Sequence, residues 1–293
     1  MKHKPLRWLV FGPGAISGLI SAGLVRQQHA IAFITRNTGA TDLITWQIHD
    51  KNGLQSFETP TYQHQWQPDA VIMAVKSYDI GVALAALDNL GISSECPIIL
   101  SHNGIVQQHS KRPLFTMITT HAATRRAYQI QHTGNGASWL ANYAENCSAK
   151  LQPPIAQAMV NSFAPLQLVD DITQRRWYKL LINCIINPLT AIYRVPNGEL
   201  AKDRYQPLIA ALIDEFLAVS ALAGYPFKAT DARQAVYQVI DDTRQNRSSM
   251  LTDIEHGRPT EIAALNGYLI NQAECYDVEV PNHRWVLTQI TRK

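Results

Sequence analysis

The chain has 293 residues, of which 46% are hydrophobic and 17% are charged, and its formal net charge is +3. This length and balance are those of a globular protein with one large or two ordinary domains, and they exclude a disordered chain. The Lys and Arg residues are scattered along the sequence rather than clustered, which argues against a nucleic-acid partner.

Cysteine spacing and hydropathy indicate the compartment. The four cysteines are far apart and form no CxxC pair: Cys96, Cys147, Cys184 and Cys275. We therefore expect reduced thiols, with neither disulfides nor a metal site. No apolar run approaches the roughly 20 residues that span a bilayer, and glycine and proline interrupt the apolar stretch near the N-terminus. These features predict a cytoplasmic protein without a membrane segment.

The first half of the chain alternates short apolar runs with helical stretches. Strands are predicted at 7–11, 29–34, 70–75 and 97–101, and helices at 15–28 and 84–90. Continuous apolar strands separated by helices are typical of a parallel sheet that is covered on both faces. From 115 to 139 the pattern becomes polar and alternating, which predicts antiparallel hairpin strands that end near residues 133–136.

Beyond about Asp171 the sequence shows helical periodicity and no convincing strand pattern. Helices are predicted at 174–189, 207–223, 230–246, 248–256 and 259–276. Apolar residues at helical spacing in the first of these helices indicate a buried face. The predicted fold class is therefore α/β, with an N-terminal Rossmann-type parallel-sheet domain over residues 1–170 and an all-helical C-terminal domain over residues 171–293.

A glycine-rich turn follows the first predicted strand. In a dinucleotide-binding loop, the first glycine permits the tight turn, the second lets the pyrophosphate approach the backbone, and the third position needs a small side chain. Here Ser17 takes the third position, with Gly18 next. Such a turn is often only structural, but its place between the first strand and the first helix favours a cofactor site. That site comprises Gly12, Pro13, Gly14, Ala15, Ile16 and Ser17.

The end of the second predicted strand discriminates between the nicotinamide cofactors. An NAD site usually carries Asp or Glu there, about 20 residues past the loop, whereas this chain has Thr35-Arg36-Asn37. Arginine can bind a 2′-phosphate through two hydrogen bonds and can stack on the adenine. A surface arginine is the alternative interpretation of Arg36. Because the carboxylate is also missing, the pattern favours NADPH over NADH.

Three polar side chains share one face of the first helix of the second half. Lys179, Asn183 and Asn187 are spaced at i, i+4 and i+8 among apolar neighbours. Asparagine is a poor helix former, so two on one stripe indicate hydrogen bonding in a polar cleft rather than an ordinary solvated face. A lysine in a cleft can donate a proton to a carbonyl oxygen. A structural ion pair explains Lys179 equally well.

A second polar cluster runs from Asn246 to Glu261. Ser248 or Ser249 can cap a helix, or the N–H groups of the same turn can bind a carboxylate. Pro259 suits the first turn of a helix and would place Glu261 early in it. There Glu261 would either cap the helix or interact favourably with its dipole, or it would bind a ribose or substrate hydroxyl.

Several motifs in order make the chain similar to the ketopantoate reductase (2-dehydropantoate 2-reductase) family over nearly its whole length. Besides the N-terminal loop, the matching segments are 74–76 (AVK), 102–104 (HNG), 120–123 (THAA), 179–192, 196–200 (PNGEL), 248–251 (SSML) and 260–262 (TEI). The resemblance implies reduction of ketopantoate to pantoate by NADPH, for pantothenate and coenzyme A synthesis.

The resemblance also implies roles for individual residues. Lys179 matches the proton donor, and Asn103 matches a residue near both nicotinamide and substrate. The remaining matches to substrate-binding positions are Asn183, Asn187, Asn197, Asn246, Ser248 and Ser249. The remaining matches to cofactor contacts are Arg36, Lys76, the backbone at Ala123, and Glu261.

Two further functions are open at this stage. One is an NADP-dependent reductase of another 2-keto or 3-hydroxy acid, and the other is a non-catalytic NADPH-binding regulator. The expected partner is a small keto acid, and both a monomer and a homodimer are compatible with the sequence. Ser17 departs from the family's third glycine, which bears on cofactor affinity.

Overall fold

The computed structural model describes residues 4–35, 43–63, 66–106 and 110–292. These residues divide into two compact units. The α/β unit covers the chain up to His102 and again from Ser110 to Ile172, and the helical unit runs from Thr173 onward. A short segment that begins at Asn103 also belongs to the helical unit, so the chain enters that unit once before returning to the α/β unit.

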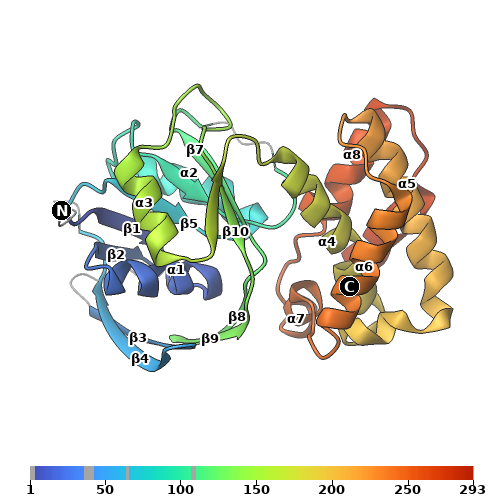
Figure 1. The fold of residues 1–293 in the computed structure, drawn as a ribbon, viewed down its shortest axis with the longest axis horizontal. Coiled ribbons are helices and arrows are strands. Elements are labelled where there is room, and N and C mark those ends of the chain that lie inside the picture. The colour runs from blue at the N-terminus through green and yellow to red at the C-terminus, as the bar shows by residue number, and fades with distance from the viewer. Residues whose placement is uncertain (1–3, 36–42, 64–65, 107–109, 293) are drawn as a thin grey trace. The chain divides into compact units, whose positions relative to one another are not determined.

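A seven-stranded sheet in the order β11-β10-β7-β6-β5-β1-β2 forms the centre of the α/β unit (Figure 1). Its strands are β1 (Arg7–Phe11), β2 (Ala30–Ile34), β5 (Ala70–Met73), β6 (Ile98–Leu100), β7 (Leu114–Thr119), β10 (Ser138–Ala141) and β11 (Leu166–Val169). The five neighbouring strands β7, β6, β5, β1 and β2 are parallel, and β10 is antiparallel to β7. The predicted parallel sheet is confirmed, but β7 extends it instead of starting a hairpin.

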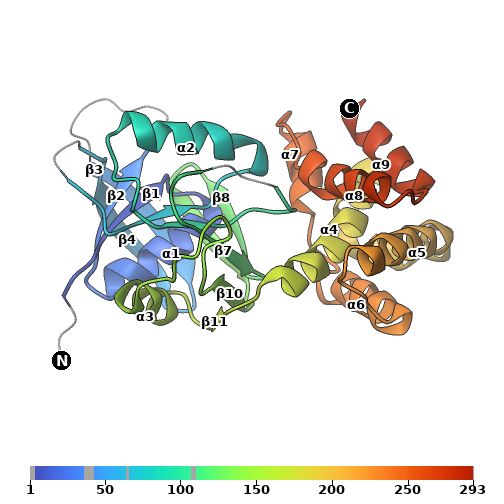
Figure 2. The ribbon, with the colours of Figure 1, turned by 90° about the horizontal axis from the view of Figure 1, so that it is seen from above.

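Helices cover both faces of this sheet (Figure 2). On one face lie α1 (Ala15–Arg26) and α3 (Pro153–Ser162); on the other lies α2 (Ile80–Asn89), which follows the short helix η1 (Ser77–Asp79). Successive side chains of a strand point to opposite faces. Accordingly, Trp8 and Val10 of β1 belong to the core that includes α1 and α3, and Leu9 belongs to the core that includes α2.

A second, four-stranded sheet packs on α1. Its strands, in spatial order, are β4 (Gly53–Pro60), β3 (Leu43–Asp50), β9 (Gln129–Gly134) and β8 (Ala122–Arg126). The hairpin of β8 and β9 is the predicted one, whereas β3 and β4 were not predicted. A Cβ built at Gly18 of α1 would overlap Cδ1 of Ile130 on β9. Gly18 therefore permits the close packing of α1 on this sheet.

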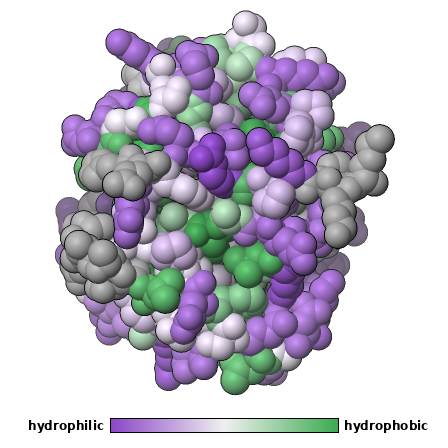
Figure 3. Space-filling view, turned by 90° about the vertical axis from the view of Figure 1, so that its left-hand side faces the viewer, coloured by the Kyte–Doolittle hydropathy of each residue, from purple (hydrophilic) through white to green (hydrophobic). Residues whose placement is uncertain are grey.

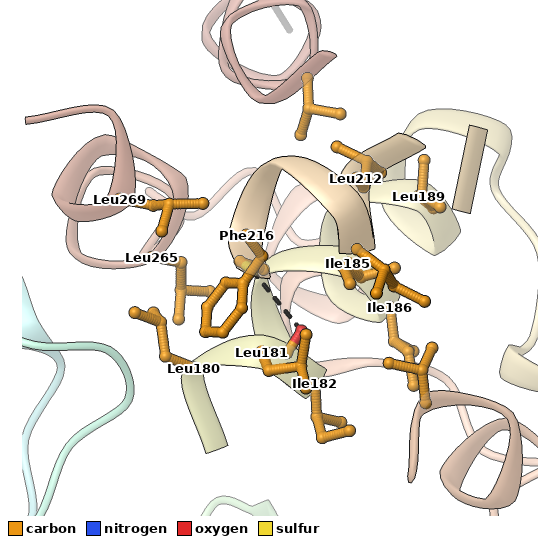
Figure 4. Packing of buried hydrophobic residues seen from close by; sticks show 14 of the residues in the cluster. Leu180, Leu181, Ile182, Ile185, Ile186, Leu189, Leu212, Phe216, Leu265 and Leu269 are labelled. Atoms are coloured by element: carbon orange, nitrogen blue, oxygen red, sulfur yellow. Dashed lines mark hydrogen bonds between the residues drawn. The ribbon is translucent and has the colours of Figure 1, made fainter. Parts of the chain in front are cut away.

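The helical unit is built around α4. Its helices are α4 (Thr173–Tyr193), η2 (Asn197–Ala201), η3 (Asp203–Tyr205), α5 (Gln206–Leu222), α6 (Ala229–Asp242), α7 (Ser249–Glu255), the π-helical turn η4 (Ala263–Gly267), α8 (Tyr268–Cys275) and α9 (Pro281–Thr291). Figure 4 shows side chains of α4, α5, η4 and α8 packed together, including Leu181, Phe216, Leu265 and Leu269. All four are buried.

Several helix boundaries differ from the prediction, among them those of α2, which begins four residues earlier at Ile80. The helix predicted at 259–276 begins only at η4, because the backbone N–H and the guanidinium of Arg258 both bond to Asp253 and hold the intervening chain in a turn. Pro259 and Glu261 therefore precede the helix. Helix α4 continues through Pro188 to Tyr193, and α6 ends at Asp242. The last helix, α9, was not predicted.

One helical stretch, Asp203–Leu222, is long and apolar enough by length and composition to cross a membrane, which the sequence analysis did not anticipate. Its Ile209, Ile213 and Phe216 are fully buried in the core of the helical unit. This is the usual position of the apolar face of a core helix. On the face of the protein in Figure 3, hydrophilic side chains predominate and hydrophobic ones lie among them, as on most globular proteins.

Candidate active site

The glycine loop joins the end of β1 to the start of α1, at the point where the order of the parallel strands reverses. Open α/β sheets bind ligands outside the carboxyl ends of their strands at such a point. Gly12 has φ +66°, a conformation that favours glycine. The N–H groups of the first turn of α1, from Ala15 onward, have no acceptor within the helix. The loop thus offers the N–H donors and the open backbone that a pyrophosphate needs.

Ser17 forms two hydrogen bonds inside this loop. Its Oγ donates to the carbonyl of Gly12 at 2.7 Å and accepts the N–H of Gly14 at 2.8 Å. The side chain is fully buried. Where relatives of this loop have a third glycine, the chain therefore has a hydroxyl that ties the first two glycines to the first turn of α1.

The other predicted cofactor contacts of the α/β unit lie at different places in the fold. Lys76 follows β5 and is half-buried, and a Cβ built at Gly14 would lie 3.9 Å from the carbonyl oxygen of Ala74, so the loop and the end of β5 are neighbours. Ala123 lies on β8, opposite His132. Arg36 falls outside the described residues.

The predicted polar face of α4 is present. Lys179, Asn183 and Asn187 are half-buried, while the intervening Leu180 and Cys184 are fully buried in the core. One side of α4 is thus fixed by packing. The opposite side presents a cation and two amides at successive turns.

Lys179 has a perturbed pKa and an acidic neighbour. Burial lowers the pKa of Lys179 to about 8, and the carboxylate of Glu261 acts in the opposite direction. Glu261 is buried, and its Oε2 accepts a hydrogen bond from Nδ2 of Asn103 at 2.9 Å. The helical unit therefore brings together three predicted site residues, Asn103, Lys179 and Glu261.

The segment at Asn103 is held against the turn that follows Glu261. The N–H of Ile105 donates to the carbonyl of Ala264 at 3.0 Å. Gly104 has φ +76°, and a Cβ built on it would overlap that same carbonyl. Only glycine fits there, so Gly104 is the residue that lets Asn103 reach Glu261. The sequence signal for it was the Asn-Gly pair after a strand.

Ser248 is the N-cap of α7, as the simpler interpretation had it. Its Oγ accepts the N–H of Leu251 at 3.0 Å and the hydroxyl of Thr190 at 2.7 Å, and the residue is buried. The Oγ1 atom of Thr190 also lies 2.9 Å from the carbonyl oxygen of Asn187, and its one hydrogen atom bonds to one of these two acceptors at a time. The two hydroxyls therefore join the start of α7 to α4 beside Asn187. Sequence reasoning did not single out Thr190 as part of this contact.

Of the remaining predicted substrate residues, Asn197 begins η2, Asn246 lies between α6 and α7, and Ser249 is the first residue of α7. The N–H of Asn197 bonds to the carbonyl of Asn246 at 3.0 Å, and Nδ2 of Asn197 donates to Thr243 at 2.8 Å. The Oδ1 atom of Asn197 is buried without a hydrogen-bond partner. Asn246 and Ser249 are exposed. Asn197 and Asn246 thus meet through their backbones, while Ser249 begins α7.

Known proteins share the sequence of both units. The family described as "Ketopantoate reductase PanE/ApbA" matches residues 8–145, and its C-terminal domain matches residues 171–293. The chain is 32% identical over 289 residues to the 2-dehydropantoate 2-reductase of Vibrio cholerae, a match that covers 96% of each chain.

Solved structures share the fold. A ketopantoate reductase of this family from Ralstonia eutropha JMP134 aligns with a TM-score of 0.85 at 19% identity, over 98% of each chain. A D-mandelate dehydrogenase solved with NADH and anilino(oxo)acetate aligns with a TM-score of 0.82, also at 19% identity and over 98% of each chain. A protein named as a ketopantoate reductase and one named as a D-mandelate dehydrogenase therefore share this fold. The matches to both family domains nonetheless show that the chain belongs to the ketopantoate reductase family.

Proposed function

We propose that this protein reduces ketopantoate to pantoate with NADPH and that Lys179 supplies the proton. The observation that carries the proposal is the polar face of α4, where Lys179 is half-buried beside Glu261 and its pKa is lowered to about 8. An ammonium group with this pKa is mostly protonated at pH 7 and yet gives up its proton readily. The choice of ketopantoate as the substrate is inferred from membership of the family.

The glycine loop fits a dinucleotide. Gly12 and Gly14 leave the backbone open, and the N-terminus of α1 provides the N–H groups for a pyrophosphate. When bound, the reduced nicotinamide supplies a hydride. Lys76 and Arg36 would contact the cofactor through their positive charges, as their family positions imply.

The residues of the helical unit would bind and protonate the keto acid. As a hydride reaches C2, the C=O π bond breaks and its electron pair goes to the oxygen, which takes a proton from Nζ of Lys179. The two new bonds are C–H and O–H. The positive charge of Lys179 also stabilises the developing alkoxide. Glu261, fixed by Asn103, favours the protonated form of Lys179 before the transfer.

The rate of NADPH oxidation with different keto acids tests the substrate. We expect ketopantoate to be the best substrate by at least an order of magnitude in kcat/KM over pyruvate, oxaloacetate and 2-ketoisovalerate. Equal rates with all four would indicate a reductase of another acid. NADPH binding without turnover of any acid would indicate a regulator.

Arg36 carries the choice of NADPH over NADH in this proposal. Removing a guanidinium that pairs with the 2′-phosphate weakens NADPH binding and leaves NADH binding nearly unchanged. Arg36→Ala should therefore narrow the ratio of the two values of kcat/KM. Arg233→Ala is a suitable control, because Arg233 is exposed on α6 and pairs with Asp214. An unchanged ratio in Arg36→Ala would overturn this assignment.

A further inference from the structure

Pro188 interrupts the backbone hydrogen bonding inside α4. Proline has no N–H, so the carbonyl four residues earlier, that of Cys184, loses its helical hydrogen bond. Cys184 is fully buried in the core of the helical unit. A buried carbonyl needs a donor, because leaving it without one is costly.

Asn266 supplies this donor. Its Nδ2 lies 2.9 Å from the carbonyl oxygen of Cys184 and 2.9 Å from Nδ1 of His283. Since an amide NH₂ group has two hydrogens, Asn266 can donate one to each acceptor. His283 then carries its proton on Nε2, which lies 3.0 Å from the carbonyl of Leu212. Asn266 and His283 are both fully buried.

These hydrogen bonds connect four elements through their interiors. Cys184 lies on α4, Asn266 on η4, His283 on α9 and Leu212 on α5. Burial lowers the pKa of His283 well below its ordinary value, in agreement with a neutral ring that accepts at one nitrogen and donates at the other. The arrangement is rigid, because each donor already has its acceptor inside the core.

Asn266 is close in the chain to Glu261, and Cys184 is close to Lys179. The carbonyl of Glu261 accepts the N–H groups of Ala264 and Leu265 at 3.0 and 3.2 Å, so the chain passes from Glu261 directly into the turn of η4, which contains Asn266. That turn is π-helical, with the N–H of Gly267 bonded to the carbonyl of Ile262. Such turns occur frequently at functional sites.

We propose that Asn266 is a positioning residue that holds Glu261 next to Lys179, by fastening η4 to the carbonyl that Pro188 leaves unpaired in α4. The proposal rests on the proposed function, because it gives Lys179 the role of proton donor. Asn266 does not touch the substrate. It acts through the spacing of two side chains, that of Lys179 on α4 and that of Glu261 just before η4.

The charges around Lys179 determine the direction of the effect. Glu261, before η4, is the charged group whose field acts on Lys179, and it raises the lysine pKa. On α4, Arg175 and Arg176 lie about one turn away, and on the segment packed against η4, Asn103 is neutral. If the turn at η4 loosens, Glu261 moves away and the pKa of Lys179 falls further.

Asn266→Leu tests the proposal, because leucine has a similar size and cannot donate. We expect the alkaline limb of kcat for ketopantoate reduction to move to lower pH by about half a unit to one unit, with the KM for NADPH unchanged. The pKa of Lys179 is also measured without turnover, from the pH dependence of its labelling by an amine-reactive reagent followed by mass spectrometry. It should fall by the same amount.

A second variant separates positioning from stability. Pro188→Ala restores the N–H that bonds to the carbonyl of Cys184, so the double variant Pro188→Ala/Asn266→Leu should regain much of the lost Tm. It should keep the lowered pKa of Lys179, because η4 is still unfastened. If Asn266→Leu does not fold, this double variant takes its place.

Val236→Ala is the matched control, since Val236 is fully buried in the same core on α6. It should lower Tm and leave the pKa of Lys179 unchanged. A labelling pKa in Asn266→Leu equal to that of the wild type, with Tm lowered as in Val236→Ala, would overturn the proposal. If the wild type does not reduce ketopantoate, the proposed function fails, and the labelling measurement still decides the role of Asn266.

Discussion

In the proposed function, the side chain of Lys179 both binds and protonates the keto acid. Replacing it by alanine removes the proton donor and the charge that stabilises the alkoxide, and leaves the glycine loop in the other unit untouched. Lys179→Ala should lower turnover by roughly two orders of magnitude or more, while the Kd for NADPH, measured by fluorescence titration, stays within a few-fold of the wild type. Near-normal turnover in this variant would refute the role of proton donor.

The pH dependence of the reaction follows from the same residue. The donor must be protonated, and burial lowers the pKa of Lys179 to about 8. The rate of keto-acid reduction at saturating NADPH should therefore fall as the pH rises through about 8. Oxidation of the alcohol needs the neutral amine as a base, so its rate should rise over the same range. If the rates of reduction and of oxidation changed in the same direction with pH, the assignment of Lys179 as the proton donor would be contradicted.

Ser17 and Ser21 form a natural pair for testing the glycine loop. Both are buried in α1, but Ser17 makes two hydrogen bonds and the Oγ of Ser21 has no partner. Ser17→Ala removes both of its hydrogen bonds and leaves the carbonyl of Gly12 and the N–H of Gly14 bonded to each other at 2.9 Å. The loss of the two bonds should lower the free energy of unfolding by about 1–3 kcal/mol. The less ordered loop should also bind NADPH several-fold more weakly.

The control for that loss is Ser21→Ala. It removes a buried hydroxyl that has no partner, so the free energy of unfolding should stay constant or rise. Urea denaturation and NADPH titration measure both quantities. If the two variants behave alike, the hydroxyl of Ser17 does not order the loop.

Among the elements, the contact of α1 with α3 depends on one glycine. A Cβ built at Gly23 of α1 would overlap the carbonyl of Ser162 at the end of α3, whereas one built at Gly81 of α2 would meet nothing within 4 Å. Gly23→Ala should force the helices apart and cost about 1–3 kcal/mol or more. Gly81→Ala should stabilise the protein by up to about 1 kcal/mol, because alanine favours helix. Thermal unfolding distinguishes the two.

The sequence predicted the elements whose pattern is local. The parallel strands are continuous apolar runs, and α4 has its apolar stripe and its polar face where periodicity put them. The hairpin of β3 and β4 was missed although its signals exist: Ile44, Trp46 and Ile48 alternate with less buried residues, and Asn52-Gly53 marks the turn.

Other features depend on contacts between distant residues and could not be predicted locally. The hydrogen bond of Asn103 to Glu261 joins residues 158 apart in the sequence, and that of Asn266 to Cys184 joins residues 82 apart. The family resemblance named Asn103 and Glu261 without their contact. It gave no reason for Gly104 or Asn266, whose roles come from packing against particular carbonyls.

At the scale of the whole molecule, the two units have separate hydrophobic cores. Phe216 is buried in the helical unit, where its ring lies 5.8 Å from that of Trp177; Phe33 is buried in the α/β unit, 5.8 Å from Trp46. Truncating either ring leaves a cavity that costs about 3–5 kcal/mol. Because the buried clusters share no residue, the loss should stay within the unit that contains the cavity.

Hydrogen exchange followed by mass spectrometry measures this directly. In Phe216→Ala, peptides from α4 and α5 should lose protection by roughly two orders of magnitude or more, as a cost of about 3 kcal/mol implies, while peptides from β1 and β5 keep theirs. Phe33→Ala should give the reverse pattern. Proteins of this length commonly unfold domain by domain, and here the chain crosses into the helical unit at Asn103 before returning. Equal loss of protection in both units for either variant would show that this crossing couples the two cores into one cooperative structure.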